Sequence, residues 1–86
     1  MIDHEAKTFV LRALLTNSQN GGGPMRDENL KEAIRGRFPG VALTNGDMTA
    51  WLRALENSSL ISGTRDDVDG VVWDLTTKGK IKAQQL

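Results

Sequence analysis

The chain has 86 residues, of which 38% are hydrophobic and 26% charged, a composition typical of one small globular domain and not of a disordered chain. The 11 Lys and Arg residues balance the 11 Asp and Glu residues, so the formal charge is zero and a strongly basic, histone-like protein is excluded. The chain has no cysteine and a single histidine, His4, which leaves no material for disulfides, thiolate chemistry or a histidine-rich metal site.

The same counts bear on catalysis and location. His4 stands at the start of the first expected helix, so no triad of nucleophile, base and acid can be assembled around it. We therefore expect no enzyme activity, no cofactor and no bound metal. No apolar run approaches the roughly 18 residues of a membrane span, and the N-terminus has no signal-peptide pattern. We expect a cytoplasmic protein without a membrane partner.

The first helix is predicted to begin at Asp3, which can cap it, and to end near Thr16. Its apolar residues recur at helical spacing: Ala6, Phe9, Val10, Ala13 and Leu14. Leu11 and Leu15 widen this stripe beyond what one small core needs. We therefore expect a weak homodimer formed through this helix.

A glycine-rich segment, about residues 17–25, is predicted to be a flexible loop. No Gly-Lys-Ser/Thr follows its glycines and no strand precedes them, so the pattern indicates a linker and not a phosphate loop. A second helix is predicted over about residues 27–35. Its inward positions are Leu30, Ala33 and Ile34, and its outward positions include Lys31 and Glu32. After the Pro39-Gly40 turn, Val41 or Leu43 is expected to enter the core.

The third helix, about residues 45–57, has the clearest pattern in the chain. Thr44 and Asp47 stand at the spacing of a capping box, in which each side chain satisfies a backbone amide of the other residue. Its apolar positions recur at helical spacing: Met48, Trp51, Leu52 and Leu55. Trp51, like Trp73 further on, has leucine neighbours, so both indoles are expected in the core.

The periodicity changes after Ser59, where two β-forming runs flank an acidic segment. If Asp69-Gly70 is a two-residue hairpin turn, Arg65 falls opposite Asp74; a longer loop starting at Arg65 is equally compatible. The acidic segment lacks the first and last ligands of a calcium loop. Thr76 can cap a short final helix that runs from Thr77 to about Gln84.

The expected fold is α+β, mostly α: a three-helix bundle, a two-stranded antiparallel hairpin and a short C-terminal helix in one domain, residues 1–86. The expected core comprises Phe9, Leu14, Leu30, Ile34, Trp51, Leu52 and Leu55. This order resembles the winged helix-turn-helix. Residues 51–61 are similar to the end of a recognition helix that leads into the first wing strand. Residues 73–79 contain the Leu-Thr-x-x-Gly phrase of MarR-, PadR- and ArsR-type regulators.

The length and the Leu-Arg-Ala-Leu run of the first helix also resemble small winged-helix proteins of Mu-like bacteriophages. The chain departs from the family pattern in its glycine-rich loop and its acidic wing, and it lacks the ligands of the metal-sensing branch. The resemblance implies transcription regulation through double-stranded DNA, with the third helix in the major groove and the wing beside the backbone.

Candidate DNA contacts can be chosen from the residue types on the third helix and around it. The outward face of the third helix offers groups that can read base edges or meet a thymine methyl; the candidates are Asn45, Thr49, Arg53 and Asn57, with Gly46 and Ala50 between them. The candidate phosphate contacts are Lys31, Arg35, Lys78 and Lys80, with Arg26, Arg37 and Lys82 nearby.

The acidic wing favours a second hypothesis. Asp66, Asp67 and Asp69 outweigh Arg65 where phosphate would come nearest. Together with the zero net charge, they favour a winged-helix module that binds a protein partner and does not bind DNA.

Overall fold

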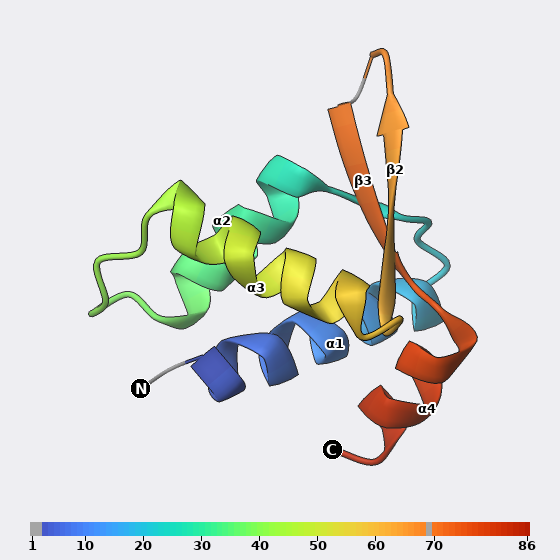
Figure 1. Ribbon diagram of the computed structural model, residues 1–86. Helices are drawn as coiled ribbons and strands as arrows, with labels where there is room; N and C mark the ends of the chain where they lie inside the picture. The colour runs from blue at the N-terminus through green and yellow to red at the C-terminus, as the bar shows by residue number, and fades with distance from the viewer. Residues whose placement is uncertain (1–2, 69) are drawn as a thin grey trace.

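A computed structural model describes residues 3–68 and 70–86 as an α+β chain (Figure 1). The elements in order are α1 (Asp3–Gln19), β1 (Met25–Arg26), α2 (Asp27–Arg37), α3 (Asn45–Asn57), β2 (Ile61–Asp66), β3 (Gly70–Leu75) and α4 (Thr77–Gln84). In Figure 1, α3 crosses the middle of the molecule, and the β2–β3 hairpin projects away from the helices. The expected helices and hairpin are therefore present, and β1 is an addition.

The helix boundaries follow the expected caps. The Asp47 amide donates to Thr44 Oγ1 at 3.1 Å, and the Thr44 amide donates to Asp47 Oδ2 at 3.2 Å, so the capping box of α3 is confirmed. Thr76 Oγ1 accepts from the Gly79 amide at 3.0 Å and caps α4 as predicted. Helix α1 continues past the predicted Thr16 to Gln19.

The helices bury one shared core against the sheet. All the predicted core residues are buried except Phe9, which is half-buried and meets the Phe38 ring edge-on at 6.3 Å between centroids. Of the two candidates in the α2–α3 connection, Leu43 packs against the core, whereas Val41 is 42% exposed.

Helix α4 packs against α1. Helix α1 is the helix whose apolar stripe is predicted to be wider than one small core needs. Leu11 is only 3% exposed, and Leu15 is half-buried against the core. The broad apolar stripe is therefore used within the chain, which removes the reason for expecting dimerisation through Leu11. The weak homodimer itself stays a prediction.

The sheet has three antiparallel strands in the order β1-β3-β2, since Met25 and Arg26 pair with Trp73 and Val72. The hairpin register places Arg65 opposite Val71 and Ser62 opposite Asp74. The Arg65–Asp74 pair that a two-residue turn would give is therefore absent, and the alternative, a loop that starts at Arg65, is also wrong because β2 continues to Asp66.

The reason for this register is burial. Ile61 and Leu75 are directly opposite one another and share the buried face. A two-residue turn at Asp69-Gly70 would have moved Ile61 to the other face, because side chains alternate along a strand. The connection instead spans residues 67–69, of which position 69 lies outside the described residues.

The glycine-rich segment is shorter than predicted, because α1 and β1 take residues from both of its ends. It also bonds back to α1: the Asn17 side-chain amide donates to Gly23 O at 2.5 Å, and the Gly22 amide donates to Asn17 O at 2.9 Å. Its flexibility stays a prediction. Within residues 3–68 and 70–86, no helix is both long enough and apolar enough to span a membrane.

Candidate functional site

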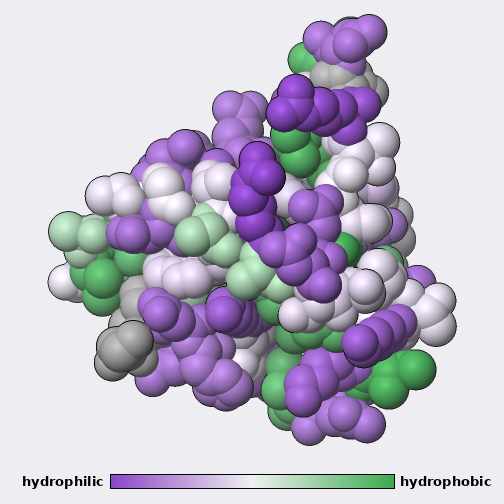
Figure 2. Space-filling view, viewed as in Figure 1, coloured by the Kyte–Doolittle hydropathy of each residue, from purple (hydrophilic) through white to green (hydrophobic). Residues whose placement is uncertain are grey.

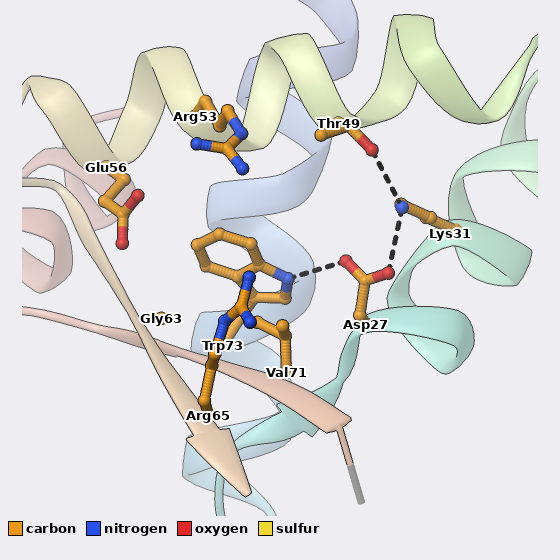
Figure 3. Close-up of a pocket in the computed structure, with 9 residues that line it drawn as sticks. All are labelled: Asp27, Lys31, Thr49, Arg53, Glu56, Gly63, Arg65, Val71 and Trp73. Carbon is orange, nitrogen blue, oxygen red and sulfur yellow. Dashed lines mark hydrogen bonds and ion pairs between the residues drawn. The ribbon is translucent and has the colours of Figure 1, made fainter.

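A pocket of about 330 Å³ lies between α3 and the hairpin (Figure 3). Its lining comes from α2, from α3 and from the sheet: Asp27, Lys31, Thr49, Arg53, Glu56, Gly63, Arg65, Val71 and Trp73. The pocket thus joins the expected recognition helix to the expected wing. It also collects three of the predicted contact residues, Lys31, Thr49 and Arg53.

Lys31 was predicted to face solvent, and this prediction is wrong. It is 6% exposed, and its ammonium contacts Asp27 Oδ2 at 2.8 Å. The same nitrogen donates to Asn45 Oδ1 at 2.8 Å and to Thr49 Oγ1 at 2.9 Å. These three acceptors match the three donors of an ammonium group, so each donor of this buried side chain has a partner.

The bonds of Lys31 change the role of three predicted DNA contacts. Asn45 and Thr49 lie on α3 and Lys31 on α2, so the bonds from Lys31 to these two predicted contacts fix the two helices together. Lys31 therefore has no free donor for a DNA phosphate. We describe Lys31 and its acceptors Asp27, Asn45 and Thr49 as the Lys31 cluster.

Trp73 extends the Lys31 cluster to the sheet. Its Nε1 donates to Asp27 Oδ1 at 2.9 Å, and its ring lies against Gly63, where an added Cβ would come 2.7 Å from Cζ3. Trp73 is buried, as is Trp51, whose Nε1 donates to Asp3 Oδ1 at 3.2 Å. Both tryptophans belong to the core, as predicted, and do not form exposed stacking platforms.

Two arginines remain accessible at the pocket. Arg53 on α3 and Arg65 on β2 are exposed, and Figure 3 shows both side chains directed toward the Trp73 indole. Among the residues that the structure describes, neither guanidinium makes a hydrogen bond or an ion pair. From the sequence, Arg65 is expected among the wing acids or opposite Asp74 and is not a candidate DNA contact; its place on the α3 side of the hairpin depends on the observed register.

The outer face of α3 is otherwise small and polar. Gly46, Ala50 and Asn57 are exposed along it, on the same helix as Arg53. Figure 2 shows mostly hydrophilic and neutral side chains over the middle of the molecule, where α3 lies, and hydrophilic ones with some hydrophobic surface around the end of the hairpin.

The remaining candidate cations do not line this pocket. Arg35 is exposed on α2, and Lys78 and Lys80 are exposed on α4. Lys78 Nζ donates to Ser58 O at 3.3 Å, which places it at the C-terminal cap of α3. These residues can flank α3 but do not converge with Arg53 on one site.

In the part of the chain that the structure describes, no group of three or more His, Asp or Glu side chains is arranged to hold a metal ion. No family model, curated protein or solved structure matches the chain. The functional assignment therefore rests on this chain's own residues and contacts.

Proposed function

We propose that this protein is a small winged-helix domain that binds double-stranded DNA, with α3 as its recognition helix and the β2–β3 hairpin as its wing. The role is that of a bacterial or bacteriophage transcriptional regulator. The observation that carries the proposal is the exposed face of α3 beside a projecting hairpin, with Arg53 and Arg65 between them and without an ion-pair partner among the described residues.

The shape of α3 supports this function. Its 13 residues span about 20 Å at the usual rise per residue, and a helix fits the major groove of B-DNA. Gly46 and Ala50 have little or no side chain, so the helix backbone can approach the groove floor closely. Asn57 is an exposed amide that can pair with an adenine edge.

The Lys31 cluster supports the function indirectly. A recognition helix must keep a fixed orientation to its supporting helix, because small displacements of its side chains remove base or phosphate contacts. Lys31 is bonded on one side to Asp27 of α2 and on the other to Asn45 and Thr49 of α3. It thus orients α3 and does not itself contact DNA.

Fluorescence anisotropy on an unselected duplex tests the proposal. We expect the wild type to bind at low salt and to weaken steeply as salt rises, because cations displace condensed counterions from the backbone. Arg53→Ala should weaken binding, whereas Arg12→Ala, an exposed arginine on α1, should change it little. A wild type that binds no duplex at low salt would contradict the proposal.

One observation favours a second function, that of a protein-interaction module. Val68 in the hairpin loop is 91% exposed, and Asp67 beside it is exposed as well. An exposed apolar side chain next to a carboxylate favours contact with another protein over contact with DNA, because the carboxylate repels the DNA phosphates. If the wild type has no DNA affinity at low salt, this function replaces the first.

A further inference from the structure

The pocket between α3 and β2 holds two like charges that the described residues leave without a counter-ion. The guanidinium groups of Arg53 and Arg65 approach it from opposite elements, and Glu56, which also lines it, makes no ion pair with either one within the described residues. Each guanidinium offers five N–H donors in a planar fork. A bound anion would use these donors and relieve the repulsion between the two charges.

Two other charged groups of the pocket, those of Lys31 and Asp27, are already bonded. The Lys31 ammonium has three acceptors, and the Asp27 carboxylate accepts from both Lys31 and Trp73. Gly63 and the Trp73 ring carbons form an apolar wall of the pocket. Among the described residues that line the pocket, Arg53 and Arg65 are therefore the cationic donors left to meet a ligand.

The charge of the pocket indicates what kind of anion fits. Lys31, Arg53 and Arg65 contribute three positive charges, and Asp27 and Glu56 contribute two negative ones, which leaves 3 − 2 = +1. A phosphodiester carries one negative charge, and the arginine fork matches its paired oxygens. The sources of such an oxyanion are the DNA backbone and free phosphate.

The direction of Arg53 favours the backbone. A base-reading side chain must project outward from the groove-facing side of its helix, whereas Figure 3 shows Arg53 directed toward the hairpin. We propose that Arg53 and Arg65 together hold one phosphodiester of the DNA backbone between α3 and β2, so that Arg53 contacts phosphate and not a base. This inference rests on the proposed DNA-binding function and changes the role predicted for Arg53 from base reading to backbone contact.

A double-mutant cycle on two duplexes of unrelated sequence tests this. Arg53→Ala and Arg65→Ala should each weaken binding about tenfold on both duplexes. Each should also lower the salt slope by about one phosphate equivalent. Because the two side chains share one phosphate, the double variant should lose much less than the product of the single losses. Arg12→Ala is the matched control, and all variants are first checked for wild-type melting.

The contrary outcomes are distinct. A loss with Arg53→Ala on one duplex only would show base reading and overturn the inference, as would multiplicative losses in the double variant. DNA binding that neither substitution weakens would overturn this inference while the proposed function stands. If no duplex binds the wild type, both proposals fall.

Titration with inorganic phosphate separates the two sources. The arginine Nε–Hε resonances of Arg53 and Arg65 are followed in the wild type at constant ionic strength. Saturable shifts in both, together with the duplex results above, support a phosphate site. Saturable shifts without any duplex binding would assign the pocket to free phosphate and overturn the backbone assignment.

Discussion

The indole nitrogen of Trp73 and the carboxylate of Asp27 are joined by a 2.9 Å hydrogen bond, and through it the sheet is tied to the helix pair. The other oxygen of Asp27 contacts the Lys31 ammonium at 2.8 Å, and Lys31 continues to α3. One carboxylate thus connects the hairpin and, through Lys31, α3 to the same helix, α2.

Lys31→Met should destabilise the protein by about 2–4 kcal/mol, because Asp27, Asn45 and Thr49 lose their shared donor while the side-chain volume is kept. Asp27 is partly exposed, which keeps the loss below that of a fully buried pair. Urea denaturation measures the change. Lys80→Met, an exposed lysine on α4, is the control and should stay within about 0.5 kcal/mol of the wild type. Equal effects in both variants would show that the Lys31 cluster adds nothing.

Gly79→Ala should unfold or strongly destabilise α4. A Cβ at this position would lie 1.8 Å from the Leu60 carbonyl oxygen, a backbone atom that cannot move away easily. We expect a loss of more than about 3 kcal/mol, or a fall in Tm of at least about 12 °C for a domain of this size. Gly36→Ala in α2 meets no atom within 4 Å and should raise Tm slightly. A Gly79→Ala variant that melts like the wild type would refute the close approach of α4 to Leu60.

Trp51→Ala should cost about 3–5 kcal/mol, because a large side chain that is 8% exposed leaves a cavity between α1 and α3. Trp51→Phe keeps an aromatic ring in the core but removes the hydrogen bond to Asp3 and part of the ring volume, so its loss should be smaller, about 1–2 kcal/mol. Thermal melting of the two variants measures both losses. Near-wild-type melting of the alanine variant would remove Trp51 from the core.

The four helices and the hairpin were predictable because their signals are local. The capping box of Thr44 and Asp47, the cap at Thr76 and the apolar stripes all lie within one helix length of sequence. Strand β1 has only two residues, Met25 and Arg26, which is too short for any periodicity to indicate it.

The wrong predictions for Lys31 and for the hairpin register arise because tertiary packing decides both features. The helical pattern of α2 alone predicts that Lys31 points outward. Asn45 and Thr49 are 14 and 18 residues away in the sequence, and only the packing of α2 on α3 brings them to Lys31. Likewise, Asp69-Gly70 fits a two-residue turn locally, and the shared burial of Ile61 and Leu75 decides the register that turns Arg65 toward α3.

The hairpin loop should limit DNA affinity through its charge. Asp67 is exposed next to the outer end of β2, on the same hairpin as Arg65, so its carboxylate repels a phosphate that approaches this side. Asp67→Lys should therefore tighten binding to an unselected duplex and steepen the salt slope by about one phosphate equivalent. Anisotropy at two salt concentrations measures both. Glu5→Lys on α1 changes the net charge equally at another exposed position and should tighten binding less. Equal tightening by both variants would show that the affinity depends on net charge and that the hairpin does not approach DNA. An Asp67→Lys variant that binds no better than the wild type would place the loop away from the DNA backbone.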